Sequence, residues 1–340
     1  MAVPAAVILA RVVRDLTQEE LGTSAGISQG FLSKVERGDV DLDGDRLLRV
    51  AAALKFPVEF FLQEPGSTAS QTACAFPRKR NSLQISVEKR VRALLQITRL
   101  QVEPLLDDDA PPVTLERRSA EDADWISPVE MAAEVRARAG LPSGPIPNLT
   151  QLLEKLGVLV VVRDLGSRRL DALGQWPNGH RPLVLVNSTA PADRRRFTSS
   201  HELGHAVLHT TATDAQEREA DQFAAALLMP PEDGRKVLRD IDIPTLERLK
   251  AQWGMSMAAL IRRARDLGLV NDYRYRQLNI ELSKAGRSNE RVQLTPESPA
   301  TLLDALARQR AAGSSSIAEL AARARMTVTE FENLYLEAAS

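Results

Sequence analysis

Residues 201–209 read HELGHAVLH, and residues 217–228, after a short gap, read EREADQFAAALL. The first stretch holds three of the four histidines in the chain. Residues four positions apart share one face of a helix, so the imidazoles of His201 and His205 can converge on one ion. Glu202 lies one position further round that helix and can reach a water molecule in the open fourth coordination position. The spacing therefore predicts a zinc site with Glu202 as the general base.

The third metal ligand has to come from another part of the chain. His209 lies about 12 Å from His201 along a helix axis, which is too far for one ion to bridge. A different class of zinc site would need a histidine ten residues after His201, where this chain has Thr211. These exclusions leave the carboxylates of the second stretch, which a loop over residues 210–216 would fold back against the first helix.

Three carboxylates of the second stretch are candidates for contact with the histidines. Glu217 falls beside His205 and is the expected third ligand. Asp221, four residues later on the same helix face, is expected to hold a ligand histidine as a hydrogen-bond acceptor. Glu219 points about 160° away on the helical wheel and is the alternative ligand.

A second informative stretch, residues 17–38, reads TQEELGTSAGISQGFLSKVERG. Thr17 can cap a short helix, with Glu20 returning a hydrogen bond to the capping residue. Gly26 marks a turn, after which Ser28 can cap a second helix. The outward side chains of that helix are of types that contact phosphates and base edges in a major groove. The expected DNA contacts are Gln18, Ser28, Gln29, Ser33 and Lys34.

Residues 5–62, which contain this stretch, resemble the Cro/repressor-type (XRE) helix-turn-helix family. The fit rests on Gln18, Gly26, Ser28, Leu32, Ser33, Glu36 and Gly38. The resemblance implies a double-stranded DNA operator and, because such repressors usually read paired half-sites, a homodimer. Residues 1–62 hold seven Lys and Arg against nine Asp and Glu, so dimerisation or the basic run Arg78–Arg80 is expected to add affinity for DNA.

The region of the metal site carries a second resemblance. Residues 195–209 (RRFTSSHELGHAVLH) and 217–230 (EREADQFAAALLMP), together with residues 146–165 and 182–188, are similar to the ImmA/IrrE-type zinc metallopeptidases. The similarity covers residues 125–235. It implies that His201 and His205 are the zinc pair, that Glu202 is the general base, and that the third ligand lies in the acidic cluster that contains Glu217.

The patterns along the 340 residues predict several domains, mainly α-helical with a small antiparallel sheet, an α+β fold. We expect a helix-turn-helix domain at 1–65, a linker and connecting helix at 66–124, the peptidase domain at 125–235 and a helical region at 236–340. Strand-like runs predict an antiparallel meander; these are Val158–Arg163, Arg169–Gln175 and Pro182–Asn187. Residues 246–264 and 317–334 share a helix-turn-helix punctuation, for which we expect structural roles rather than a second DNA-reading site.

Two requirements of a peptidase remain open in the sequence. The run Arg169–Gln175 is a candidate edge strand that takes a peptide as an added strand, with Gly174 permitting close approach. The group that stabilises an oxyanion is not selected by the sequence, because four residues are chemically able to donate to it: Tyr273, Tyr275, Arg262 and His180.

The composition restricts the setting of the protein. A net charge of −1 gives no global field that attracts nucleic acid, so DNA binding has to come from a local surface. The single cysteine, Cys74, excludes a disulfide within the chain and favours a reducing compartment. No apolar run approaches the roughly 20 residues that span a bilayer, so we expect a cytoplasmic protein without membrane contact.

Three functions agree with these observations. The first is a DNA-binding transcription regulator whose zinc-dependent endopeptidase domain cleaves a protein, either a partner repressor or the chain itself. The second is a repressor whose peptidase-like domain senses a ligand or the metal without proteolysis. The third is an enzyme whose helix-turn-helix domain binds a protein repressor instead of DNA. The intact HELGH stretch favours the first.

Overall fold

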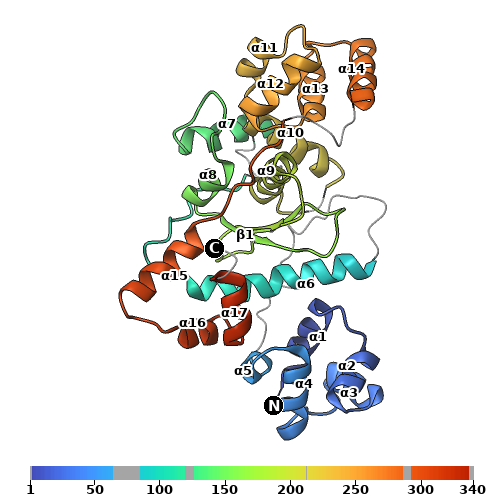
Figure 1. Ribbon diagram of the computed structural model, residues 1–340, viewed down its shortest axis with the longest axis vertical. Coiled ribbons are helices and arrows are strands. Elements are labelled where there is room, and N and C mark those ends of the chain that lie inside the picture. Colours follow the sequence, from blue (N-terminus) through green and yellow to red (C-terminus); the bar gives the residue numbers. More distant parts are fainter. Residues whose placement is uncertain (1, 64–84, 119–125, 212, 286–291, 337–340) are drawn as a thin grey trace. The chain divides into compact units, whose positions relative to one another are not determined.

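The computed structural model describes residues 2–63, 85–118, 126–211, 213–285 and 292–336 (Figure 1). The predicted basic run Arg78–Arg80 and Cys74 lie outside these residues. The chain forms two compact units. Unit 1 contains the described residues up to 63, from 85 to 110 and from 300 to 336, and unit 2 contains those from 111 to 299.

Unit 1 begins with five short helices whose ends follow from local sequence: α1 (Pro4–Val13), α2 (Gln18–Ala25), α3 (Gln29–Arg37), α4 (Gly44–Leu54) and α5 (Val58–Phe61). Thr17 caps α2 and, with Glu20, forms the predicted capping box. Gly26 ends α2 with a φ of 64°, a left-handed conformation that costs glycine little. The buried faces of these helices pack around one hydrophobic core.

Unit 1 is completed by segments from two distant parts of the chain. The first contains α6 (Ile85–Val102) and the 3-10 helix η2 (Glu103–Leu105); the second contains α15 (Thr301–Ala311), α16 (Ile317–Arg323) and α17 (Val328–Tyr335). Ala93 and Ile97 of α6 belong to the core of the first five helices. The guanidinium of Arg14 donates to both carboxylate oxygens of Glu330 at 2.9 and 3.0 Å. The chain therefore leaves unit 1 after η2 and returns to it at α15.

The α16–α17 pair repeats the turn geometry of α2 and α3. Ser316 and Glu319 form a capping box, Arg325 has a φ of 54°, and Thr327 caps α17, all at the same spacing as in the N-terminal pair. The exposed positions of α17 that correspond to the expected DNA contacts of α3 carry no cation.

Unit 2 contains a three-stranded sheet of β1 (Leu159–Arg163), β2 (Ala172–Gln175) and β3 (Leu183–Asn187) in the order β1-β3-β2. The predicted antiparallel meander is wrong in one pairing, because β1 and β3 are parallel while β2 and β3 are antiparallel. The long connection from β1 to β2 carries the chain past the central position, which β3 then occupies. Alternating strand patterns do not encode this order. The sheet is mixed, and the α+β class is confirmed.

Eight helices of the described residues belong to unit 2: α7 (Pro128–Arg138), α8 (Leu149–Lys155), α9 (Ala192–Leu208), α10 (Gln216–Leu228), α11 (Pro231–Val237), α12 (Ile243–Trp253), α13 (Met257–Asp266) and α14 (Asp272–Ala285). Helix α9 packs on β2 and against α10 (Figure 1). A Cβ on Gly204 would lie 3.0 Å from a ring atom of Phe223 and 3.2 Å from the Cα of Ala220, so glycine allows α9 and α10 to approach closely. Every helix among the described residues is too short or too polar to cross a bilayer.

The two units group residues differently from the four predicted segments. The buried core of unit 2 continues past residue 235 to Leu278 and Leu282 of α14, whereas α15–α17 lie in unit 1. The predicted region 236–340 is therefore divided between the units. Helical periodicity indicates that these helices exist, but it does not indicate which core each of them joins.

Candidate metal centre and DNA-contact helix

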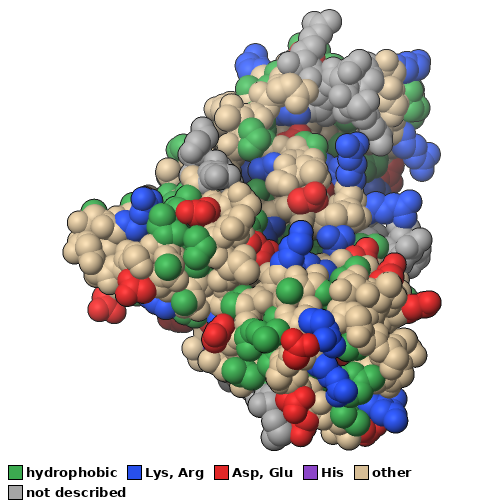
Figure 2. Space-filling model, turned by 60° about the horizontal axis from the view of Figure 1, so that its bottom comes forward, with side chains coloured by type: hydrophobic (Ala, Val, Ile, Leu, Met, Phe, Trp, Pro, Cys, Tyr) green, Lys and Arg blue, Asp and Glu red, His purple; other side chains and the backbone are tan. Residues whose placement is uncertain are grey.

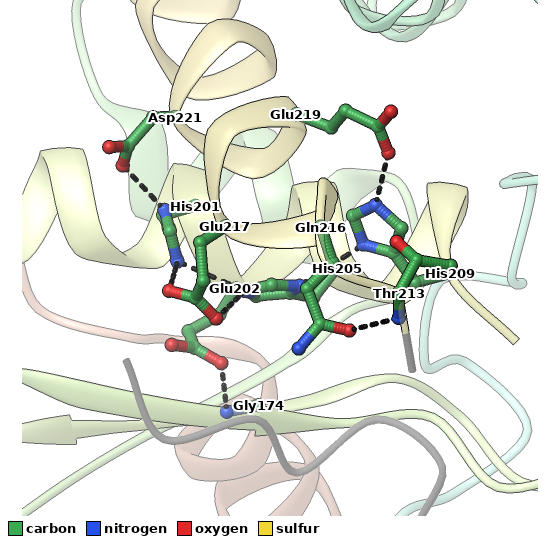
Figure 3. A network of polar contacts seen from close by, with 10 residues as sticks. All are labelled: Gly174, His201, Glu202, His205, His209, Thr213, Gln216, Glu217, Glu219 and Asp221. Carbon is green, nitrogen blue, oxygen red and sulfur yellow. Dashed lines mark hydrogen bonds and ion pairs between the residues drawn. The ribbon is translucent and has the colours of Figure 1, made fainter. Parts of the chain in front are cut away.

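Two helices bring the predicted metal ligands together (Figure 3). His201 and His205 lie one turn apart on α9, and Glu217 lies in the first turn of α10. The Nε2 atoms of the two histidines are 3.0 Å apart. The Glu217 carboxylate is 3.4 Å from the Nε2 of His205 and 3.7 Å from the Nε2 of His201.

This donor set fits a zinc ion. The candidate ligand atoms all lie within 4.8 Å of one another. Four ligands at zinc–nitrogen distances of roughly 2.0–2.1 Å are separated by about 3.3 Å in a tetrahedron, which is close to the spacings found here. One carboxylate oxygen of Glu217, Oε2, is buried and makes no hydrogen bond. Two imidazoles and one carboxylate are the three protein ligands that a catalytic zinc with one open position requires.

The protonation states of the cluster also suit a metal. Burial lowers the pKa of His205 from 6.5 to about 4, so its ring is neutral at neutral pH. Burial raises the pKa of Glu217, but the hydrogen bond with His205 and the neighbouring histidine charges outweigh it and leave that pKa below its usual value. Neutral imidazoles and ionised carboxylates are the forms that bind metal ions.

Each candidate histidine ligand has a partner on its second ring nitrogen. Nδ1 of His201 is 2.9 Å from a carboxylate oxygen of Asp221. Nδ1 of His205 is 3.1 Å from Nδ1 of His209, and the Nε2 of His209 is 3.0 Å from Glu219 (Figure 3). From the sequence, His209 and Glu219 are considered only as metal ligands. The third histidine at the same four-residue spacing is the signal for the contact of His209 with His205.

Glu202 lies on the side of the cluster that faces the sheet (Figure 3). Its side chain is buried, and its Oε2 accepts a hydrogen bond of 2.8 Å from the backbone N–H of Gly174 in β2. A Cβ on Gly174 would lie 2.9 Å from the Cβ of Glu202. Glycine at this position therefore allows the edge strand to approach the candidate base, a contact that the sequence does not reveal.

The four candidates for oxyanion stabilisation are placed differently. Arg262 forms an ion pair with Asp266, which raises its pKa; Tyr275 and Asp221 raise it further, whereas burial lowers it. The electrostatic contact with Asp221 places Arg262 near the ligand cluster. Tyr275 lies under the guanidinium of Arg265, Tyr273 is 72% exposed, and His180 accepts a hydrogen bond from Trp176 through its carbonyl. None of these contacts selects one residue for the role.

The expected DNA contacts lie on and beside α3. Gln29 donates to Gln18 at 2.9 Å, and Gln18 donates to Glu36 at 2.8 Å. The Ser28 hydroxyl is used as the cap of α3, where it accepts from the N–H of Phe31. The other two expected contacts, Ser33 and Lys34, are half-buried and exposed respectively.

Arg37 was not predicted as a DNA contact, yet it lies one turn after Ser33 and donates to the Ser33 hydroxyl at 2.9 Å. It supplies a second cation on α3, although Asp39 pairs with it. Figure 2 shows acidic and basic side chains interspersed on the face that it presents.

Two family models match the chain, one in each unit. Residues 153–265 match a peptidase family model described as an IrrE N-terminal-like domain, and this segment contains the sheet, the ligand cluster and the α12–α13 pair. Residues 9–61 match a family model described as helix-turn-helix. No curated protein matches the chain. The chain thus contains a segment similar to helix-turn-helix domains, followed by a segment similar to IrrE N-terminal-like peptidase domains.

Proposed function

We propose that this protein is a DNA-binding transcription regulator with a zinc-dependent endopeptidase domain, and that the peptidase cleaves a protein to change gene expression. The substrate is a partner repressor or the chain itself. The observation that carries the proposal is the convergence of His201, His205 and Glu217, with Glu202 beside them, inside the segment that matches a peptidase family.

The residues of the site divide the chemistry between them. His201, His205 and Glu217 would hold zinc, which when bound supplies a Lewis acid for a water molecule and a scissile carbonyl. Glu202 takes a proton from that water and passes it to the leaving amine. The N–H of Gly174 fixes one oxygen of Glu202 during this transfer. Asp221 keeps the proton of His201 on Nδ1, so that its Nε2 is available to the metal.

The edge strand β2 offers a place for the substrate. The N–H of Asn187 donates to the carbonyl of Asp171, which puts the odd-numbered residues of this strand in the ladder with β3. The backbone groups of Ala172 and the carbonyl of Gly174 therefore point toward the edge that β3 does not use, while the N–H of Gly174 is taken up by Glu202. An extended peptide that adds to this edge is held mainly by its backbone. The substrate is accordingly an extended segment of a protein.

The first five helices of unit 1 supply the DNA-binding function in this proposal. Helix α3 enters a major groove with Gln29, Ser33 and Lys34 toward the DNA, while Gln18 and Ser28 position its N-terminal end. Paired half-sites require two such helices, so the active form is a homodimer. Sedimentation of the purified chain checks this mass directly.

Elemental analysis of the purified full-length chain tests the metal site. We expect about one zinc per chain in the wild type, as the single cluster found in the described residues requires. The His201→Ala and Glu217→Ala variants should each lose the zinc. The control is Asp214→Asn, which changes an exposed carboxylate in the loop between α9 and α10 and should keep the zinc. A folded wild type without zinc would contradict the peptidase and favour a repressor that senses a ligand.

Glu202→Gln separates cutting from metal binding. This variant should retain zinc and bind DNA, yet lose cleavage and the regulation that depends on it. Unchanged regulation in the variant would contradict the proteolytic mechanism. If substitution of Gln29 and Lys34 leaves regulation intact, the helix-turn-helix binds a protein rather than DNA.

A further inference from the structure

The third histidine of the HELGHAVLH stretch is buried beside the metal cluster. Helix α9 ends at Leu208, and His209 is its C-cap, with extended backbone angles of φ −125° and ψ 117°. The change of direction turns the His209 ring toward His205, so that their centroids are 5.1 Å apart. His209 is only 4% exposed, although it is not among the ligand atoms of the cluster.

The hydrogen bonds that connect His205, His209 and Glu219 determine which ring nitrogens carry protons. Two ring nitrogens, the Nδ1 atoms of His205 and His209, face each other at 3.1 Å, so one of them carries a proton and the other accepts it. The Nε2 of His205 faces the Nε2 of His201 and the Glu217 carboxylate, and it must be unprotonated when it binds zinc. In the zinc-bound state the proton of His205 is therefore on Nδ1, and it is donated to His209.

The same logic continues to α10. Since His209 accepts at Nδ1, its own proton is on Nε2, which lies 3.0 Å from a carboxylate oxygen of Glu219. An ionised carboxylate can only accept a hydrogen bond, so a neutral His209 cannot carry its proton on Nδ1 and leave Nε2 bare toward Glu219. His201 donates directly to a carboxylate, that of Asp221. His205 instead donates to the ring of His209, which in turn donates to the carboxylate of Glu219.

We propose that His209 and Glu219 are positioning residues, which hold His205 in the one tautomer and orientation that leaves its Nε2 free for the metal. This proposal rests on the proposed zinc site. It also gives distinct roles to the three carboxylates of the first turns of α10: Glu217 is the ligand, Asp221 orients His201, and Glu219 orients His205 through His209. The line joins the end of α9 to the start of α10 across their connecting loop.

The test is the zinc dissociation constant of the full-length chain, measured by competition with a chromophoric chelator. His209→Leu removes both hydrogen bonds, from His205 to His209 and from His209 to Glu219. We expect it to weaken zinc binding roughly 10- to 100-fold. Glu219→Gln keeps the side-chain shape but removes the charge that fixes the tautomer, and should weaken binding by a smaller factor. Asp214→Asn removes one exposed charge from the same loop and should leave the constant within about twofold of the wild type, because screened exposed charges contribute little. Circular dichroism checks that each variant is folded.

A second readout is independent of zinc affinity and of activity. Nitrogen-15 spectra of the histidine rings in the zinc-loaded chain should place the proton on Nδ1 of His205 and on Nε2 of His209. If His209→Leu does not fold, His209→Asn keeps an acceptor for His205 and should bind zinc more weakly than the wild type. The opposite tautomers, or wild-type zinc affinity in folded His209 and Glu219 variants, would overturn the proposal. A wild type that binds no zinc contradicts the proposed function instead.

Discussion

Gly174 is the residue at which the sheet comes closest to the candidate base. Its backbone N–H binds Glu202, and its missing side chain leaves the space that Glu202 fills. Its φ lies outside the left-handed region, so the backbone itself would accept alanine. The requirement for glycine is therefore steric, and it can be tested without backbone strain.

Gly174→Ala should destabilise unit 2 and displace Glu202. The new Cβ would lie 2.9 Å from the Cβ of Glu202, and such overpacking typically costs about 1–3 kcal/mol. Urea unfolding followed by circular dichroism measures the loss, and cleavage should fall while zinc content is kept. Gly30→Ala is the control, because no atom lies within 4 Å of its Cβ position. Equal stability of Gly174→Ala and the wild type would refute the steric account.

The depressed pKa of His205 predicts that the stability of the metal-free protein depends on pH. Burial depresses its pKa from 6.5 to about 4, so the unfolded state binds more protons than the folded state between these values. Stability is therefore full above pH 6.5 and decreases as the pH falls toward 4. From pH 7 to pH 5 this one group should cost about 2 kcal/mol. Urea unfolding of chelator-treated protein at both pH values measures it, with His205→Asn as the control that should show a smaller difference.

At the scale of elements, α3 is the candidate for contact with DNA. Lys34→Ala removes an exposed cation, and if Lys34 contacts a phosphate, binding should weaken evenly across sequences. The slope of log affinity against log salt should fall by about 1. Binding to a random-sequence duplex pool at several salt concentrations measures both effects. Lys89→Ala, which removes an exposed cation of α6, should leave the slope unchanged. A slope unaffected by Lys34→Ala would exclude its phosphate contact.

The elements that could be predicted from sequence are those with local causes. Capping boxes, left-handed glycines and four-residue spacing act within one or two turns, so α2, α3, α9 and α10 follow from their own residues. The parallel pairing of β1 with β3 could not be predicted, because it depends on where the chain goes between them. The contact of His209 with His205 was missed for a related reason: axial distance excludes a shared metal ion, but a hydrogen bond needs only the turn at the end of α9.

At the scale of the whole molecule, neither main core uses residues beyond 300. The buried core of unit 2 ends at Leu282, and the core of the first five helices ends at Ile97. A chain that stops after Pro299 also keeps Glu297, which accepts from the backbone N–H groups of Leu149 and Thr150 at the start of α8. The last three described helices are therefore dispensable for both cores.

Removal of residues 300–340 should accordingly leave zinc content unchanged and the first five helices folded. The Arg14–Glu330 ion pair is lost, which for a partly exposed pair costs at most about 1 kcal/mol. Elemental analysis and the protease resistance of residues 2–63 check the two parts of this expectation. Loss of zinc from the shortened chain would show that α15–α17 support the peptidase unit.

Because α15–α17 return to unit 1, unit 2 is an insertion within unit 1. A single nick between residues 111 and 299 breaks covalent continuity, yet the two fragments stay joined without a peptide bond, because α15 and α16 pack on η2 and Arg308 pairs with Asp107. Self-cleavage there would halve the chain on a denaturing gel while its native mass stays the same. A nick between residues 63 and 85 likewise leaves the first five helices packed on α6, because Ala93 and Ile97 belong to their core. A cut on either side of α6 therefore shows on a denaturing gel before it shows in the native mass.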